Sequence, residues 1–213
     1  MEFNPDQLPS RTVYKLLIGA IVPRPIGWIS TVSANGQPNL APFSYFNVVA
    51  HNPPTLVFGP GIRGTDGSPK DTLRNVGATG EFVANIVTEE IVEAMNVTAT
   101  EFPAQVNEFE AAGLTALPSK VVRPPRVGES PVHFECRVVQ IVKLGDHPAA
   151  GSLVIGRVVY VHVREDVLFD GDKIDVRRLK PVGRLAGSGY CRVTDLFEME
   201  RPPSQIKKQA QKP

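Results

Sequence analysis

Cysteine is nearly missing from this sequence, and so is any pattern of residues that would hold a metal. The 213 residues include two cysteines, Cys136 and Cys191, which lie far apart and in no metal-ligand spacing. A disulfide-stapled secreted domain is therefore excluded, and a cytoplasmic protein with reduced thiols is expected. Four histidines and no Ser-His-Asp or Cys-His arrangement also predict neither a metal centre nor a protein nucleophile.

Excess charge and long apolar runs are missing as well. Lys and Arg total 23 against 22 Asp and Glu, for a formal charge of +1. A balanced chain has no global field to attract nucleic acid or an anionic membrane. No run approaches the roughly 18 apolar residues of a membrane span, and Met1–Asp6 is acidic, unlike a secretory leader. We expect no nucleic-acid partner and no membrane.

Proline and glycine, in contrast, are abundant. There are 20 prolines and 18 glycines, and 42% of the residues are hydrophobic. This composition predicts a mainly β protein with many turns, short strands and ample material for a core. No linker, repeat or low-complexity segment divides the chain, so 1–213 is predicted to be a single domain with its core at about 8–201. The tail 202–213 has few apolar residues and is expected to be mobile.

The segment from Val22 to Pro54 organises the rest of the chain. Asn35-Gly36 lies between two apolar runs, which predicts a β-hairpin with strands at Ile26–Val32 and Gln37–Ala41. Pro42 lacks an N–H group, so we expect strand pairing to break near it and to leave backbone groups free for a ligand. The alternative is a plain edge strand with a bulge.

A helix beginning near Lys70 follows the glycine-rich loop Gly59–Pro69. The loop is not a P-loop, because no Gly precedes Lys70 and Asp71 replaces the hydroxyl residue of that motif. The helix start could bind phosphate through its free N–H groups, the Lys70 charge and the Thr72 hydroxyl, and Arg24 could contact the same phosphate. Asp71 is predicted to be the N-cap. The alternative is an ordinary capped helix.

Further strands and helices are predicted along the remaining chain. A short helix should begin at Ser10, and two more at about Thr88–Met95 and Gln105–Ala112 should pack on the sheet as an insertion. Asn85 falls in a strand that is apolar on both faces, so it needs buried partners, either a neighbouring turn or a ligand. The predicted strands are Thr55–Phe58, Glu81–Val87, Val132–Val138 and Ser152–Arg164.

Several blocks of this sequence, in order, resemble a known family. They are PRPIGWIST from Pro23, NLAPFSYF from Asn39 followed by NPP, KDT at Lys70–Thr72, GDH at Gly145–His147, and RLAGSGY ending at Tyr190. Together they resemble the flavin reductase-like domain family of the flavoredoxin type, over about Leu8 to Arg201. The resemblance implies an FMN-binding split β-barrel, a Greek-key-like antiparallel barrel with a few peripheral helices.

The resemblance and the local patterns together predict the site. Ser30 and Thr31 could reach the ribityl chain or the phosphate, although a Ser-Thr pair in a strand is usually structural. Tyr190 could cover the flavin ring, and either His147 or His162 could meet nicotinamide or protonate the flavin. The predicted cofactor-binding residues are Arg24, Ser30, Thr31, Asn39, Ala41, Pro42, Phe43, Ser44, Phe46, Lys70, Asp71, Thr72 and Asn85.

The predicted activity is an NAD(P)H-dependent flavin reductase that passes hydride from nicotinamide to flavin N5. FMN is the expected flavin, with FAD possible, and NAD(P)H is the transient donor. The resemblance also implies a homodimer and allows a partner monooxygenase or another electron acceptor. Two alternatives stay open: an FMN-binding electron carrier without a nicotinamide site, and a β-barrel binding module without turnover.

Overall fold

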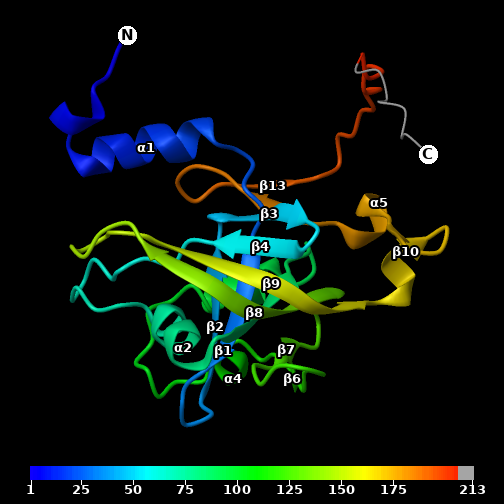
Figure 1. The fold of residues 1–213 in the computed structure, drawn as a ribbon, viewed down its shortest axis with the longest axis horizontal. Helices are drawn as coiled ribbons and strands as arrows, with labels where there is room; N and C mark the ends of the chain where they lie inside the picture. The colour runs from blue at the N-terminus through cyan, green and yellow to red at the C-terminus, as the bar shows by residue number, and fades with distance from the viewer. Residues whose placement is uncertain (206–213) are drawn as a thin grey trace, which may run out of the picture.

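The protein is built around one antiparallel sheet of seven strands (Figure 1). The computed structural model describes residues 1–205, so most of the predicted tail 202–213 lies outside the described residues. The sheet order is β2-β1-β5-β8-β9-β4-β3. Its strands are β1 Gly27–Val32, β2 Pro38–Phe43, β3 Phe46–His51, β4 Pro54–Phe58, β5 Glu81–Ile86, β8 Val132–Lys143 and β9 Ser152–Val163.

The sheet curls into a barrel that stays open on one side. β2 and β3 are the two outer strands of the sheet, yet only Ser44 and Tyr45 separate them in sequence. A link this short can join opposite edges only if the sheet bends round until the edges meet, since each residue spans at most about 3.6 Å. The opening between β2 and β3 is the split, and the predicted split β-barrel is confirmed.

The predicted hairpin at Asn35-Gly36 is present. β1 and β2 pair from Val32↔Pro38 to Gly27↔Phe43, and Gly36 takes the positive φ of 83° that the turn requires. The expected break at Pro42 is wrong, because Pro42 pairs in register with Trp28. β2 is an edge strand, where a proline can sit with its missing N–H facing away from the ladder.

Two hydrophobic clusters stabilise the barrel, and β1 contributes to both. Ile29 belongs to the cluster inside the barrel, where Phe58 lies between Phe43 and Phe82 with ring centroids 5.3 and 5.1 Å away. Trp28 points to the opposite face and joins the cluster beneath the short helices, and its indole N–H donates to Thr98 at 2.8 Å. This alternation explains why every residue of β1 is buried.

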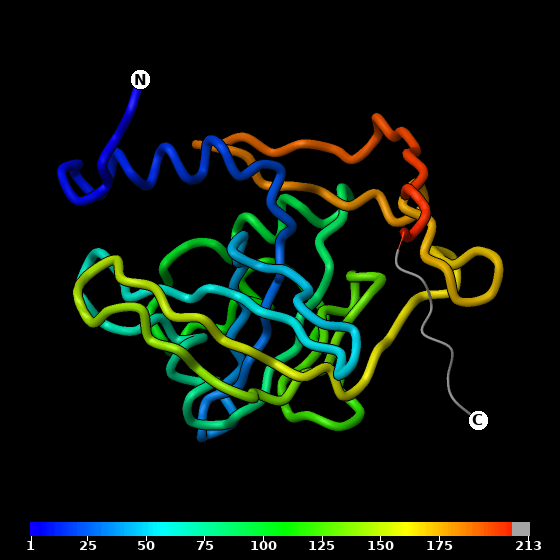
Figure 2. Tube along the Cα trace, turned by 45° about the horizontal axis from the view of Figure 1, so that its top comes forward, coloured from blue at the N-terminus to red at the C-terminus, as the bar shows by residue number. Residues whose placement is uncertain are grey.

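Five α-helices lie at the periphery of the barrel in the described chain. α1 (Ser10–Ala20) stands outside the sheet in both views (Figures 1 and 2) and buries only Ile18. α2 (Asp71–Thr79) packs on β1 and β2. The two insertion helices are shorter than predicted, since they cover only α3 (Val92–Val97) and α4 (Glu108–Ala111). The fifth is α5 (Val176–Leu179).

The remaining elements are short. The 3-10 turns are η1 (Pro5–Gln7) and η2 (Glu165–Val167), and the two-stranded pairs are β6 (Ala116–Leu117) with β7 (Arg126–Val127), β10 (Leu168–Phe169) with β11 (Lys173–Ile174), and β12 (Val182–Arg184) with β13 (Tyr190–Arg192). Within residues 1–205, every helix is too short or too polar to cross a membrane. The β12–β13 hairpin matters most here, because it reaches the functional site.

A buried histidine makes the stability of this fold depend on pH. His133 is 5% exposed, its Nε2 lies 2.8 Å from the Val127 carbonyl, and its Nδ1 has no hydrogen-bond partner within residues 1–205. Burial lowers the pKa of His133 from 6.5 to about 4. Between these pH values the unfolded chain binds a proton that the folded chain does not, so stability falls as pH falls.

We therefore expect the wild type to lose up to about 3 kcal/mol of unfolding free energy relative to His133→Gln between pH 6.5 and 4. Glutamine can still donate to the Val127 carbonyl but does not titrate in this range. Urea unfolding of both proteins at several pH values measures the difference. Parallel pH profiles for the two proteins would show that His133 is not the group responsible.

Candidate functional site

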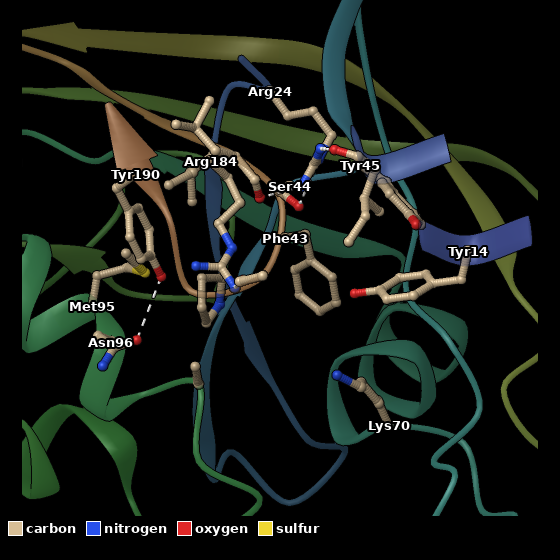
Figure 3. A pocket seen from close by; sticks show the side chains of 17 residues that line it. Tyr14, Arg24, Phe43, Ser44, Tyr45, Lys70, Met95, Asn96, Arg184 and Tyr190 are labelled. Atoms are coloured by element: carbon tan, nitrogen blue, oxygen red, sulfur yellow. Dashed lines mark hydrogen bonds between the residues drawn. The ribbon is translucent and has the colours of Figure 1, made fainter. Parts of the chain in front are cut away.

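A cleft opens at the split of the barrel, where the end of β2 meets α3 and the β12–β13 hairpin. We call it the main cleft; its volume is about 380 Å³, within the range of small-molecule pockets. Figure 3 shows Phe43 at its centre, Lys70 and Tyr14 on one side, and Arg184 and Tyr190 on the other. Its further lining includes Arg24, Pro42, Ser44, Tyr45, Met95, Asn96 and Ala99.

A smaller hollow of about 140 Å³ adjoins the main cleft, and we call it the side bay. Pro42, Lys70 and Ala99 line both spaces, so the two hollows are neighbours. The side bay is also lined by Asn39, Ala41, Arg63, Asp71, Thr72, Thr98, Thr100, Glu101, Phe102 and Glu108. The end of β2 and the start of α2 therefore face one elongated space, as the sequence-based hypothesis requires.

The start of α2 presents unused hydrogen-bond donors to the side bay. Lys70 is the N-cap residue, its side chain makes no capping bond, and the first helical amide with a partner is that of Arg74. The prediction that Asp71 is the N-cap is therefore wrong. Thr72 Oγ1 accepts a hydrogen bond from Asn39 Nδ2 at 3.0 Å, which leaves the Thr72 hydroxyl proton free to donate. Such a helix end attracts anions.

Asp71 does not oppose an anion in the way its charge alone would suggest. Its carboxylate pairs with Arg63 and with Arg74, one on each oxygen. Two cations around one carboxylate leave this three-residue cluster net positive. Glu101, which accepts a hydrogen bond from Thr65, also lines the side bay and partly offsets that charge. Lys70 adds a further charge, since its ammonium group makes no hydrogen bond or ion pair with any residue in 1–205 and lies 5.8 Å from the Phe43 ring centroid.

The two-residue link between β2 and β3 supplies donors at the other end of the space. The amides of Ser44 and Tyr45 make no hydrogen bond within the described part of the chain, although the Tyr45 carbonyl accepts from Gly59 at 2.7 Å. Both residues line the main cleft. Unpaired amides need a partner, so this link is suited to the polar edge of a flat ligand.

Arg24 lies in the main cleft but is not free to bind a phosphate. Its guanidinium donates to the carbonyls of Ile18 (2.9 Å), Ile21 (2.7 Å) and Leu185 (3.0 Å) and to Ser44 Oγ (3.3 Å). These bonds join the end of α1, the β2–β3 link and the β12–β13 hairpin. Arg24 is thus positioned to hold three distant segments together around the cleft, which differs from the predicted phosphate contact.

Ser30, Thr31 and Asn85 do not line this site, because their side chains are satisfied inside the protein. Ser30 donates to the Pro125 carbonyl at 2.5 Å, and Thr31 accepts from Asn75 at 3.0 Å. The Asn85 amide donates to the Trp28 carbonyl and accepts from the Val127 amide. The structure therefore favours hydrogen bonding within the protein, and not ligand binding, as the role of all three residues.

The two histidines predicted near the reaction are also placed elsewhere. His162 lies on β9, with its Nε2 2.6 Å from buried Glu135. His147 is exposed in the β8–β9 turn, and its Nδ1 lies 3.1 Å from the Pro148 carbonyl. Neither lines the main cleft or the side bay. Tyr190 does line the main cleft, with Arg184 4.5 Å from its ring centroid.

The remaining predicted residues are brought together, and several others join them. Asn39, Ala41, Pro42, Phe43, Ser44, Lys70, Asp71 and Thr72 line the main cleft or the side bay. Phe46 lies behind them, against Gly27. The sequence analysis missed Tyr14, Arg63, Met95, Asn96, Glu108 and Arg184. Of these, only Arg184 carried a usable signal, because it begins the RLAGSGY block.

Glu108 is the missed residue with the clearest electrostatic consequence. It is 8% exposed, lines the side bay and accepts a hydrogen bond from the Leu40 amide at 3.2 Å. Burial raises the pKa of this carboxyl. A carboxyl that resists ionisation opposes an anion in the side bay less than an ordinary carboxylate would.

Comparison with known proteins agrees with this geometry. The family described as "Flavin reductase like domain" matches residues 19–176. An uncharacterized protein of Halalkalibacterium halodurans is 45% identical over 205 residues, covering 95% of this chain and 97% of the relative. Nitrilotriacetate monooxygenase component B of Bacillus cereus has a solved structure with a TM-score of 0.88, 40% identity, and coverage of 93% and 98%.

A second solved structure extends the likeness to a differently named protein. The 2-nitrobenzoate 2-nitroreductase of Pseudomonas fluorescens superposes with a TM-score of 0.84 at 31% identity, covering 96% of this chain and all of that one (100%). The blocks noticed in the sequence, the split barrel and these matches agree. The chain belongs to the flavin reductase-like domain family.

Proposed function

We propose that this protein binds FMN and works as an NAD(P)H-dependent flavin reductase. One observation carries the proposal: the uncapped start of α2 and the free amides of the β2–β3 link face the same elongated space. The first is suited to a phosphate and the second to the polar edge of a flavin ring. FMN carries both groups, whereas FAD would need room for a second nucleotide.

The residues of the site divide between the two ends of the ligand. Lys70, the Thr72 hydroxyl and the free α2 amides would hold the phosphate in the side bay. The amides of Ser44 and Tyr45 would donate to the ring edge, while Phe43 and Tyr190 would limit access of water. Donors at the ring edge stabilise the negative charge of a reduced flavin. The bound flavin would supply the hydride-accepting atom, N5.

Hydride transfer from nicotinamide requires an open ring face and no protein nucleophile. The main cleft is bordered on one side by Arg184 and Tyr190 on the β12–β13 hairpin. We propose that NAD(P)H approaches on this side. The name of the Bacillus cereus neighbour, component B of a monooxygenase, supports a partner monooxygenase or another electron acceptor as the consumer of the electrons.

Anaerobic mixing with NADH or NADPH tests the reductase proposal. The FMN-loaded protein should absorb in the oxidised-flavin band at about 450 nm. We expect this absorbance to fall within minutes of mixing with at least one of the two nucleotides. Dithionite serves as the control, because it reduces any accessible flavin. A flavin that bleaches with dithionite but with neither nucleotide would contradict the reductase proposal and favour the electron carrier.

We also propose that the protein forms a homodimer in the cytoplasm. α1 exposes Tyr14 (54%) and Leu17 (52%), Ile21 directly after the helix is 59% exposed, and β3 exposes Val48 and Val49. Exposed apolar side chains of this number favour coverage by a second copy. Light scattering of the purified protein measures the mass directly.

A further inference from the structure

Glu108 is a buried acid in the side bay to which the proposed function gives no role. It lies at the start of α4, is 8% exposed and lines the hollow proposed for the flavin phosphate. Its Oε2 accepts from the Leu40 amide at 3.2 Å, whereas its Oε1 accepts no hydrogen bond from another residue within residues 1–205. A carboxyl this buried needs a partner for both oxygens, and the side bay is where a ligand can supply one.

Strand β2 holds the Glu108 carboxyl close to a group proposed to bind the phosphate. Asn39 and Leu40 are neighbours in β2: the Asn39 side chain donates to the Thr72 hydroxyl at 3.0 Å, and the Leu40 amide donates to Glu108. Both α2 and α4 pack on this strand. The side bay has a volume of only about 140 Å³, so a phosphate that accepts from the Thr72 hydroxyl also comes close to the Glu108 carboxyl.

The net charge around the side bay depends on whether Glu108 holds a proton. The other charged groups in or next to this hollow are Lys70, Glu101, and Asp71 with its partners Arg63 and Arg74. When Glu108 is ionised, the positive and negative charges of this set balance. When Glu108 is protonated, one positive charge is in excess, and the side bay attracts an anion more strongly.

The surroundings of Glu108 already favour its protonated form. Burial raises the pKa of the Glu108 carboxyl, although the amides of Glu108 and Leu40 and the charge of Arg63 partly oppose this effect. A phosphate in the same small hollow should raise this pKa further, because two anions in contact cannot both stay fully ionised. A phosphate monoester itself loses its second proton at a pKa of about 6. The two groups would therefore compete for one proton.

We propose that Glu108 shares one proton with the flavin phosphate, so that the side bay binds FMN together with that proton. This inference rests on the proposed function, since the flavin phosphate is the second partner. The proton comes from the phosphate where FMN is still singly protonated, and from solvent at higher pH. An O–H group that donates to an anionic oxygen makes a strong hydrogen bond. Glu108 thereby determines which protonation state of the phosphate the protein accepts.

Fluorescence titration with FMN at several pH values from about 6.5 to 8.5, above the phosphate pKa, tests the proposal. At the upper end, the complex keeps a proton that the free protein and free FMN have lost. We therefore expect the dissociation constant of the wild type to rise by up to about 10-fold per pH unit. Riboflavin has no phosphate, so its dissociation constant should not change with pH.

Glu108→Gln isolates the shared proton. The glutamine side chain can still accept from the Leu40 amide and can donate to the phosphate, but it does not titrate. Its dissociation constant for FMN should vary by less than about 2-fold over the same pH range. The variant should consequently bind FMN more tightly than the wild type at the upper end of the range.

Isothermal titration calorimetry in two buffers of different ionisation enthalpy counts the protons directly. We expect the wild type to take up about one proton per FMN at a pH of about 8, and Glu108→Gln to take up none. Glu110→Gln is the matched control and should behave as the wild type. Glu110 lies on the same helix, is exposed and lines neither the main cleft nor the side bay.

Three results would overturn the shared proton: no proton uptake by the wild type, equal pH profiles for the wild type and Glu108→Gln, or a profile abolished by Glu101→Gln and not by Glu108→Gln. The last would assign the proton to the other acid of the side bay. The calorimetric count on the wild type requires no variant to fold. Failure of the proposed flavin function is distinguishable, because that protein would take up no FMN at any pH.

Discussion

Replacing Lys70 with methionine should raise the dissociation constant for FMN about 30-fold and leave that for riboflavin unchanged. A charge-assisted hydrogen bond to a phosphate contributes about 1.5–3 kcal/mol, and each 1.4 kcal/mol is about a factor of ten in affinity. Lys70 stands at the start of α2, and its ammonium group makes no hydrogen bond or ion pair within residues 1–205, only a contact with the Phe43 ring. Riboflavin lacks the phosphate, so its affinity isolates the ring contacts.

Fluorescence quenching of each flavin on titration with the protein measures both constants. Lys143→Met is the control, because Lys143 is an exposed lysine at the end of β8 and lines neither the main cleft nor the side bay. Equal weakening of FMN and riboflavin by Lys70→Met would contradict a phosphate contact. It would place the effect at the ring instead, and the orientation proposed for the ligand would be wrong.

Replacing Glu135 with alanine should lower the unfolding free energy by about 3–5 kcal/mol, the expected loss for a broken buried polar network. Glu135 is fully buried and accepts from the amides of Lys120 (2.7 Å), Val121 (2.7 Å) and Val122 (3.2 Å). His162 contacts the same carboxylate at 2.6 Å. Alanine would leave the buried Val122 amide and the amides of Lys120 and Val121, which form part-buried hydrogen bonds, without this acceptor. A buried amide without a partner costs about 1–3 kcal/mol.

The carboxylate of Glu135 is held in its ionised form. Burial by itself would raise the pKa of Glu135, but the Lys120 amide and the His162 side chain outweigh burial and lower it. Chemical unfolding at neutral pH measures the loss. Glu129→Ala is the control, since Glu129 also accepts from a backbone amide, that of Thr115, but at an exposed position. Similar losses for the two variants would contradict the anchoring role of Glu135.

Local patterns in the sequence were sufficient to predict most of the barrel. Asn35-Gly36 specifies the β1–β2 turn by its own backbone preference, and the strand predicted at Val132–Val138 is part of β8, although His133 and Glu135 on its expected polar face are buried. These features depend on neighbours within a few residues. The pairing order that places β2 and β3 at opposite edges depends on contacts far apart in sequence and was not predicted. The split barrel itself was expected only from the family resemblance.

The site residues show which interactions could not be predicted from the sequence. Lys70 and Ser44 line one cleft because two separate blocks of the sequence converge there. Arg24 was interpreted as a phosphate ligand because its charge is visible in the sequence, whereas the three carbonyls that occupy it are not. His162 was considered for chemistry for the same reason, and its partner Glu135 is 27 residues away. Side-chain partners of this kind appear only in three dimensions.

The proposed binding mode requires that one FMN molecule is held at both ends of the elongated space at once. Amide hydrogen exchange with and without FMN tests this most directly. FMN should slow exchange at Ser44 and Tyr45 and also at Thr72 and Leu73, whereas riboflavin should protect only the first pair. Protection by FMN at one end alone, or at neither, would contradict the proposed binding mode.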